Sequence, residues 1–278
     1  MNYKHMVKSK DLKSKQYQPP SSLWHYTSFE ILTHILDLKN ECLKDRQMLN
    51  FHFGNPLQTN DKKEVRFFEE FVYDTKKGKE LKLEVERVKT NIGNPFCLSL
   101  IHHIEDEKNY PSCEIPMWRM YGNQFSGVRL RFDFKKIKNH YSKLDNYNIF
   151  RCNYLTKTKM AEKGREIRKL FKQSDTCLDI EKIYKDAISY KTYDWVYENE
   201  WRIVAWCKDN NKVDFIPQTG RLYITQEIPL DFLETIEIGP KADQEAIEGS
   251  LNLIKEKIGD IKENHFNIKK SKLQIGYV

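Results

Sequence analysis

The pattern of apolar and polar residues along the chain predicts short strands separated by turns and charged helices. It is clearest at residues 128–133, where apolar and charged side chains alternate with a period of two, as in a half-buried strand. On that pattern the charged residues Arg129, Arg131 and Asp133 share the side facing solvent. Further strands are expected at 23–28, 95–101, 195–206, 221–225 and 235–239.

Helical signals lie between these strands. Residues 29–36 carry apolar side chains at helical spacing, and the Ser28 hydroxyl is suited to cap the start of that helix. A short helix stopped by its glycine is expected at 117–122, lysine-rich helices within 157–190, and a last helix at about 243–257. Strands and helices do not alternate regularly, which favours an α+β fold over a doubly wound sheet.

The composition is that of a globular chain. Of 278 residues, 39% are hydrophobic and 13% aromatic, which argues against disorder because such side chains bury large areas. We expect one domain at 21–278, preceded by a flexible basic arm at 1–20. No secretory signal is visible, and no apolar run approaches the roughly 18 residues of a membrane span, so a soluble, cytoplasmic protein is expected. Six cysteines form no C-x-x-C pair, and no metal is expected.

The formal net charge of +7 bears on possible partners. A positive charge favours a polyanion such as nucleic acid. Lysine-rich exposed helices produce the same charge without binding anything, so charge alone leaves both interpretations open.

The strongest candidate chemistry lies in segment 195–206. If this segment is a strand, Glu198, Glu200 and Arg202 share one face. Two close carboxylates raise each other's pKa and are costly when partly buried, unless they lie on a solvated edge beside Arg202. A carboxylate also stabilises the oxocarbenium ion that forms when a glycosidic bond breaks, and a second one orients or deprotonates the nucleophile. The pair alone does not distinguish N-glycosidic from O-glycosidic substrates, or either from a metal site.

Three motifs give this pair a context. His25-Tyr26-Thr27 comes first, Phe96-Cys97-Leu98-Ser99 with Tyr121 second, and Tyr197-Glu198-Asn199-Glu200 last. Their order resembles the ADP-ribosyltransferase superfamily, whose members carry a first-strand His or Arg, a central Ser or Tyr motif and a late Glu-x-Glu motif.

Seven motifs, spread over residues 22–260, point to a narrower group. They are His25 to Ser28, Asn60 to Glu64, Phe96 to Ser99, Trp118 to Tyr121, Gly127-Val128, Tyr197 to Arg202 and Ile238-Gly239-Pro240. Together they resemble the DUF2971 family of uncharacterised bacterial proteins. Asp61 and Glu64 also have the spacing of a helix capping box, and capping is favoured over a place in a cleft for the second motif.

The resemblance implies two antiparallel β-sheets flanking an NAD cleft, with flanking helices. It implies that Glu200 holds the nicotinamide ribose and stabilises its cation, and that Glu198 positions the acceptor. His25 would bond a ribose hydroxyl and Tyr121 would stack on the nicotinamide ring. The other binding candidates are Tyr26, Thr27, Ser99 and Arg202. Ordinary structural roles are the alternative for each, and for Arg202 an ion pair with a glutamate is favoured over a phosphate clamp.

The implied reaction is mono-ADP-ribosylation, in which ADP-ribose moves from NAD to a macromolecular acceptor. The Arg-first and Ser-Thr-Ser motifs of transferases that modify arginine are missing from the sequence, and basic charge with interleaved aromatics favours RNA or DNA over protein as acceptor. The family suggests a toxin or phage-defence effector with an antitoxin or chaperone partner. Alternatives are an NAD glycohydrolase, a non-catalytic nucleic-acid-binding protein of the same fold, and a metal nuclease using Glu198, Glu200 and Asp133.

Overall fold

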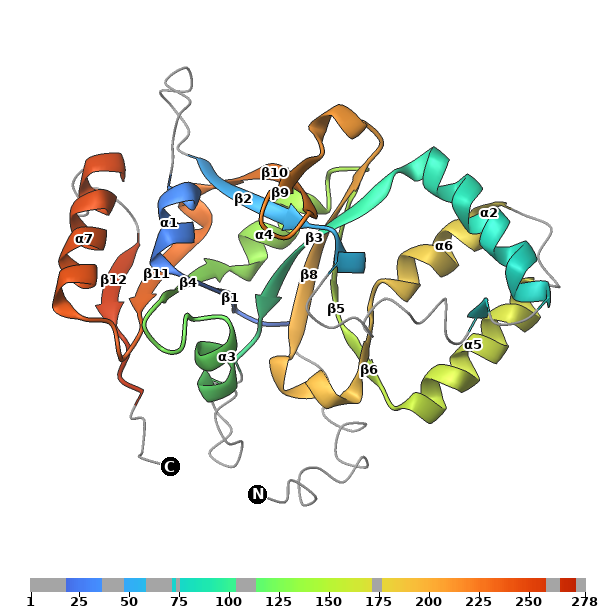
Figure 1. The fold of residues 1–278 in the computed structure, drawn as a ribbon, viewed down its shortest axis with the longest axis horizontal. Coiled ribbons are helices and arrows are strands. Elements are labelled where there is room, and N and C mark those ends of the chain that lie inside the picture. The colour runs from blue at the N-terminus through green and yellow to red at the C-terminus, as the bar shows by residue number, and fades with distance from the viewer. Residues whose placement is uncertain are drawn as a thin grey trace.

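A ten-stranded sheet built from three ladders organises the molecule (Figure 1). The computed structural model describes residues 19–36, 48–58, 72–73, 76–103, 114–171, 177–258 and 266–273. The first ladder has the order β12-β11-β4-β1, with β1 (Ser22–Thr27), β4 (Val128–Asp133), β11 (Leu233–Ile238) and β12 (Asn267–Lys270). Its pairs are antiparallel except β11–β12, which is parallel.

The other two ladders are antiparallel, each with a long central strand. One contains β3 (Asn94–Ile101), β8 (Glu200–Cys207) and β5 (Tyr147–Arg151), and the other β2 (Met48–Gly54), β10 (Arg221–Pro229) and β9 (Asp214–Ile216). The ladders join at single residue pairs, Trp24 with Ile101 and Gly54 with Cys97. β3 is therefore the strand at which all three ladders meet.

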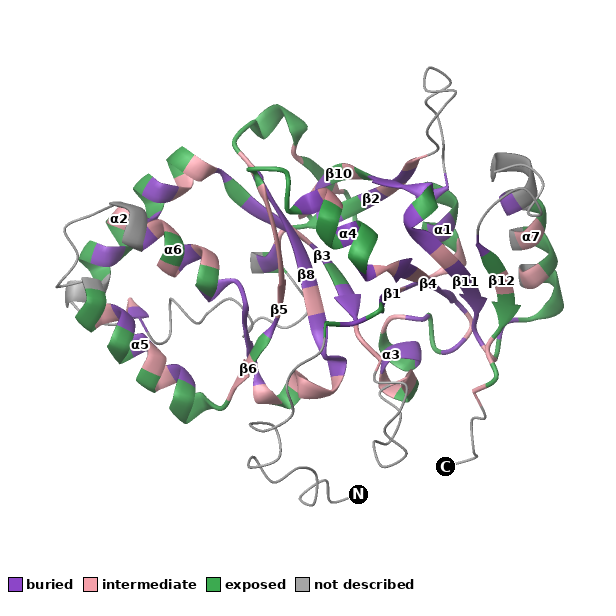
Figure 2. Cartoon of the chain, turned by 180° about the vertical axis from the view of Figure 1, so that it is seen from behind, coloured by how far each residue is buried: buried purple, intermediate pink, exposed green. Residues whose placement is uncertain are grey.

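Helices cover the sheet and continue past one end of it. Around the sheet lie α1 (Phe29–Ile35), α3 (Glu114–Met120), α4 (Phe134–Tyr141) and α7 (Gln244–Ile258). At one end, α2 (Lys76–Ile92), α5 (Lys157–Phe171) and α6 (Cys177–Ala187) lie together, near a two-stranded parallel sheet of β6 (Asn153–Leu155) and β7 (Tyr190–Thr192) (Figure 1). Figure 2 shows buried residues following the central strands, whereas α2, α5 and α6 alternate buried and exposed positions.

Two apolar cores correspond to these two parts. The larger core lies along the sheet and includes Phe51, Phe53 and Phe96. The smaller one joins α2, α5 and α6 to the end of β8 through Val85, Ile167, Tyr184 and Trp206, among others. Among the described helices, none combines the length and apolar character needed to cross a membrane.

The α+β class and most predicted elements are confirmed. The alternation at 128–133 gives β4, the Ser28 side chain caps α1 by accepting from Ile31 N at 3.2 Å, and the short helix before Gly122 is α3. The sheets are arranged differently from the two separate antiparallel sheets that were expected. Hydrogen bonds join the three ladders into one sheet that contains a parallel pair. The Asn60 to Glu64 motif and residues 1–18 of the expected arm lie outside the described residues.

Two expectations from strand periodicity are wrong. Arg129 does not face solvent, because its side chain is buried between β1, β11 and α3. The strand expected at 195–206 begins only at Glu200. Residues Tyr193–Glu198 form a 3-10 helix instead, and it ends at Asn199 in a left-handed backbone conformation with φ 44°.

Candidate active site

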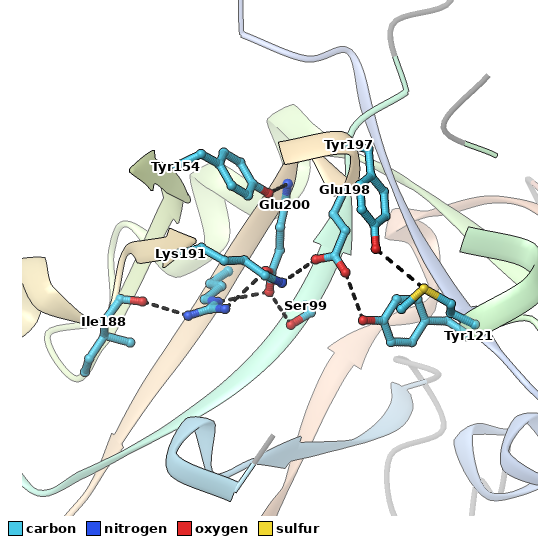
Figure 3. A network of polar contacts seen from close by, with 10 residues as sticks. Ser99, Tyr121, Tyr154, Ile188, Lys191, Tyr197, Glu198 and Glu200 are labelled. Carbon is cyan, nitrogen blue, oxygen red and sulfur yellow. Dashed lines mark hydrogen bonds and ion pairs between the residues drawn. The ribbon is translucent and has the colours of Figure 1, made fainter. Parts of the chain in front are cut away.

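The backbone turn at Asn199, which has a left-handed conformation, brings the side chains of two glutamates from different elements to the same buried lysine. Glu198 ends the 3-10 helix, Asn199 turns the chain, and Glu200 opens β8. Asparagine enters this backbone region more readily than most residues. Its side chain is held on both sides, since Oδ1 accepts from Arg151 Nε at 2.9 Å and Nδ2 donates to the His102 carbonyl at 2.8 Å. Both carboxylates consequently reach Lys191 Nζ on β7 (Figure 3).

The Glu200 carboxylate is enclosed by donors. Oε1 accepts from Ser99 Oγ at 2.5 Å and from Arg202 Nε at 2.9 Å. Oε2 accepts from Lys191 Nζ at 2.8 Å and from Arg202 Nη2 at 3.1 Å. A carboxylate offers about four lone-pair positions, so these donors occupy all of them. The backbone is fixed as well, because Glu200 N donates to Tyr154 OH at 2.8 Å.

The Glu198 carboxylate has fewer partners. Tyr121 OH donates to its Oε1 at 2.9 Å, and Lys191 Nζ donates to its Oε2. Figure 3 shows the lysine amine between the two carboxylates and the Tyr121 hydroxyl pointing at Glu198 from the other side. Glu198 is 2% exposed and Lys191 4%, so both charges are almost fully removed from water. One donor per oxygen leaves Glu198 able to accept more hydrogen bonds.

These surroundings shift the pKa values of the two carboxyls in opposite directions. Burial raises the pKa of Glu198, more than Lys191 and Tyr121 lower it, and the Glu200 charge adds to the increase. Burial would also raise the pKa of Glu200, but Arg202 and Lys191 outweigh it and hold that pKa well below its usual range. Glu200 is thus a fixed anion, while Glu198 is the carboxyl that can exchange a proton. Such a split is typical of acid–base pairs in enzymes.

His25 joins the cluster through Ser99. Its Nδ1 lies 3.2 Å from the Ser99 carbonyl oxygen, and the Ser99 hydroxyl donates to Glu200. Burial lowers the pKa of His25, and the bond to Ser99 offsets only part of this, so the ring is neutral near pH 7. Because a carbonyl can only accept, Nδ1 carries the proton and Nε2 is an acceptor. Within the described part of the chain Nε2 has no hydrogen-bond partner.

Tyr121 is held by a turn with unusual backbone angles. Asn123, Gln124 and Phe125 all have positive φ, at 47°, 52° and 77°. A bulky residue such as Phe125 pays a steric cost in that region, and such conformations often occur at functional sites. Backbone bonds hold the turn, from Phe125 N to Trp118 O at 3.1 Å and from Gly127 N to Gly122 O at 2.9 Å. Burial, and then the Glu198 charge, raise the pKa of the Tyr121 hydroxyl, which keeps it protonated as a donor.

The comparison with protein families bears on this region. Residues 117–203 match the family model described as "Protein of unknown function (DUF2971)". The match supports the DUF2971 resemblance over that segment, which contains Tyr121, Lys191, Glu198, Glu200 and Arg202. His25 and Ser99 lie before it. Among curated proteins and among solved structures no match is found.

Six of the eight residues predicted for the site meet in this one network. They are His25, Ser99, Tyr121, Glu198, Glu200 and Arg202. Arg202 pairs with Glu200, as favoured, and its Nη1 donates to the Ile188 carbonyl at 2.8 Å. Thr27 is buried at the end of β1 and Tyr26 belongs to a different cluster, so no polar contact between described residues brings either one to the glutamates. Asp133 caps α4 by accepting from Lys136 N at 3.0 Å, which removes it from the suggested nuclease triad.

Sequence reasoning missed Lys191 and Tyr154. The expected helices ended at residue 190 and no element was assigned to Lys191, although Tyr190-Lys191-Thr192-Tyr193 has the aromatic and β-branched residues of a short strand. That local signal was available. Its pairing with β6, which brings Tyr154 to Glu200, depends on residues far apart in the sequence.

A second buried charge cluster lies around Arg129. Its Nη1 donates to Tyr26 OH at 2.8 Å and lies 3.2 Å from Glu114 Oε1, while Nη2 lies 2.8 Å from Glu237 Oε1. The guanidinium also stacks 4.0 Å from the Trp24 ring centre. Burial would lower the pKa of Arg129, but these partners raise it on balance. This cluster ties β1, β4, β11 and α3 together.

Proposed function

We propose that the protein is a mono-ADP-ribosyltransferase that moves ADP-ribose from NAD to a macromolecular acceptor, with RNA or DNA favoured over protein. One observation carries the proposal. Residues named by the resemblance come from four separate segments, yet contacts run from His25 through Ser99, Glu200 and Lys191 to Glu198 and Tyr121. A chance set of motifs would not be expected to converge in this way.

The chemistry of the cluster suits this reaction. The bond between ribose C1 and the nicotinamide nitrogen breaks, its electron pair leaves with nicotinamide, and a nucleophilic acceptor atom bonds to C1. The sugar becomes cationic in the transition state, and a carboxylate beside it lowers the barrier. His25 Nε2 is an acceptor suited to a ribose hydroxyl, and the half-buried Tyr121 offers a ring face to a flat, cationic nicotinamide.

A nucleic acid acceptor is supported by where the positive charge lies. α2 carries six basic and three acidic residues, and α5 carries six basic and two acidic residues. α5 begins at Lys157, three residues after Tyr154, so this basic helix starts next to the candidate site. Cationic surfaces of this kind attract phosphates, and the attraction weakens steeply with salt.

The decisive experiment incubates the protein with NAD labelled in the adenylate portion, together with separate pools of RNA, DNA and protein. We expect label in the RNA or DNA pool and one nicotinamide released per ADP-ribose transferred. Nicotinamide release at the same rate without acceptor, and without incorporation, would instead identify an NAD glycohydrolase. Salt-sensitive nucleic acid binding without any NAD turnover would identify a non-catalytic binding protein.

The proposal extends to a role as a toxin or phage-defence effector, because uncontrolled NAD consumption or nucleic acid modification stops growth. Induced expression of the wild type in bacteria should arrest growth, whereas Glu198→Gln at equal abundance should not. Arrest by both proteins would show that the growth effect is independent of the proposed chemistry.

A further inference from the structure

The two carboxylates of the candidate site differ in how many hydrogen bonds they can still accept. Glu200 receives donors from Ser99, Lys191 and Arg202 at all four lone-pair positions. To bond a ribose hydroxyl, it would have to give up one of these charge-assisted bonds, three of which come from the cations Lys191 and Arg202. Glu198 receives one donor on each oxygen, and one of the two is the hydroxyl of a partly exposed tyrosine.

We infer that Glu198, not Glu200, is the carboxylate that contacts the substrate, and that Lys191 is the positioning residue that holds it there. This inference rests on the proposed function and reverses the roles that the family resemblance assigns to the pair. Glu200 then has a structural role, in which its carboxylate holds Lys191 and Arg202 in position. Glu198 becomes the catalytic carboxylate, which faces the sugar cation and takes the proton of the attacking acceptor group.

The contacts of Lys191 explain how it positions Glu198. β7 places its amine between the two carboxylates, within 2.8 Å of Glu200 Oε2 and bonded to Glu198 Oε2. Glu200 is itself fixed by Arg202, whose Nη1 is bonded to the Ile188 carbonyl 2.8 Å away. A series of hydrogen bonds therefore runs from the Ile188 carbonyl through Arg202, Glu200 and Lys191 to Glu198, and it restricts the movement of the Glu198 carboxylate. Oε2 of Glu198 accepts the last bond of this series, and Oε1 accepts from Tyr121.

Tyr121 marks the side from which a substrate would approach. It is half-buried and, like Tyr197, packs against an apolar cluster that includes Trp118. The Tyr197 hydroxyl lies 3.5 Å from Met120 Sδ, and Met120 is exposed. A substrate hydroxyl or N–H on this side can add a second bond to Glu198 Oε1 or replace that of Tyr121. At Glu200, by contrast, donors already occupy both oxygens, with Ser99 and Arg202 on Oε1 and Lys191 and Arg202 on Oε2.

The first test separates the two carboxylates by turnover. Glu198→Gln should lower kcat for NAD by about 10²–10⁴-fold, the range for loss of a general acid–base group, with an unchanged melting temperature. Glu200→Gln should lower the melting temperature, and the fraction that stays folded should retain more turnover than Glu198→Gln. A folded Glu200→Gln protein that is inactive, beside an active Glu198→Gln protein, would overturn the inference.

The second test addresses Lys191 through the pH profile. The groups facing Glu198 are Lys191 from β7, Glu200 from β8, Tyr197 from its own 3-10 helix and Tyr121 beyond α3. Only Lys191 among them is a cation, so Lys191→Met should shift the acidic limb of kcat/KM to higher pH. Lys191→Arg keeps the charge and should return the limb toward the wild-type position. Lys185→Met removes a lysine from a partly exposed pair with Glu181 and should leave the limb unmoved.

A third measurement keeps this inference separate from the proposed function. Carbon-13 NMR of glutamate carboxyls reports the titration of Glu198 and Glu200 without any substrate. We expect Glu198 to titrate above the usual carboxyl range, and to shift upward in Lys191→Met, while Glu200 stays ionised into strong acid. A wild type with this titration but no NAD turnover would sink the proposed function alone. NAD turnover with no shift of Glu198 in Lys191→Met would sink the role of Lys191 alone.

Discussion

The Lys191 and Arg129 clusters contain similar groups and differ in what surrounds them. Each places a buried cation between two carboxylates beside a tyrosine hydroxyl: Lys191 with Glu198, Glu200 and Tyr121, and Arg129 with Glu114, Glu237 and Tyr26. Arg129 lies under aromatic rings, with Trp24 at 4.0 Å, Trp118 at 5.4 Å and Tyr26 at 5.7 Å from its guanidinium carbon. Around Lys191 the ring cover is thinner: the Trp195 ring centre lies 5.4 Å from its amine, and the Tyr121 ring that bonds Glu198 is partly exposed.

This difference suggests how to tell a structural charge cluster from a reactive one. The Arg129 cluster links four elements, and Lys269 reaches the second oxygen of Glu237 at 3.2 Å. The Lys191 cluster leaves Glu198 able to accept further bonds and shifts the pKa of its two carboxyls in opposite directions. Burial of charge is common to both clusters, so burial alone does not mark a site. Incomplete hydrogen bonding does not mark one either, because Arg129 Nε is buried without a partner among the described residues. The opposite pKa shifts of Glu198 and Glu200 are what favour the Lys191 cluster as the reactive one.

Removing the Arg129 guanidinium should have the largest effect on stability. Arg129→Met leaves Glu114 and Glu237 without their shared partner, and breaking a buried pair in this way costs about 3–5 kcal/mol. Denaturant unfolding should report that loss. Arg131→Met provides the control, because its ion pair with Glu234 is partly exposed and is worth about 0–1 kcal/mol. A stable Arg129→Met protein that has lost only NAD turnover would place Arg129 in the site and invalidate the comparison.

The Glu200 and Glu198 variants should differ in stability as well as in turnover. Glu200→Gln should cost about 2–3 kcal/mol at pH 7, because Arg202 and Lys191 lose an anion that both contact. The native pKa of Glu200 is lowered, so its contribution is present above the ordinary carboxyl pKa of about 4.3 and is lost as the pH falls below it. The difference between wild type and Glu200→Gln should therefore shrink in acid.

Glu198→Gln is the matched control for that experiment. The native pKa of Glu198 is raised, so its ionised form opposes folding as the pH rises through that pKa. The amide removes this penalty, and we expect stability at pH 7 to stay within about 1 kcal/mol of wild type. Equal losses for the two variants, with the same pH dependence, would mean that the carboxylates are interchangeable.

One histidine beside each cluster, His103 near Arg129 and His25 near Lys191, should make the stability of the fold fall in acid. Burial, followed by the charges of Arg129 and His102, lowers the pKa of His103 to about 3, and its Nε2 lies 2.7 Å from Tyr26 OH. Stability from the neutral ring is present above the ordinary pKa of about 6.5 and is lost as the pH falls toward 3. Because the ring is only half-buried, we expect about 1–2 kcal/mol.

Unfolding followed between pH 7 and pH 3.5 would test this. His103→Gln should flatten the acid slope more than His25→Gln does, because the bond from His25 to Ser99 offsets part of the effect of burial. A larger change in His25→Gln would assign the acid sensitivity to the Lys191 cluster instead.

The sequence allowed the elements to be predicted better than the contacts between them. β4 and α1 follow from periods of two and of 3.6 that are visible locally. Alternation assigns the sides of a strand but not what covers each side, so the burial of Arg129 under α3 could not be foreseen. Lys191 was missed because a buried lysine contradicts the usual distribution of charge, and its partners come from other elements. The order of the motifs led to six residues of the network. It gave no indication that hydrogen-bond donors would surround Glu200 more completely than Glu198.

The smallest effect we predict concerns Asn199, where the period of two breaks. Asn199→Gly keeps the left-handed backbone accessible and loses only the side-chain bonds to Arg151 and His102. Asn199→Ala loses the same bonds and must also adopt a φ of 44°, which costs about 1 kcal/mol more. Unfolding free energies should therefore separate the two variants by about that amount. Turnover should fall further in the alanine variant, because a relaxed turn draws Glu198 away from Lys191. Equal stability and turnover in both variants would mean that the turn does not hold the two glutamates together, and that β8 and the 3-10 helix are positioned independently.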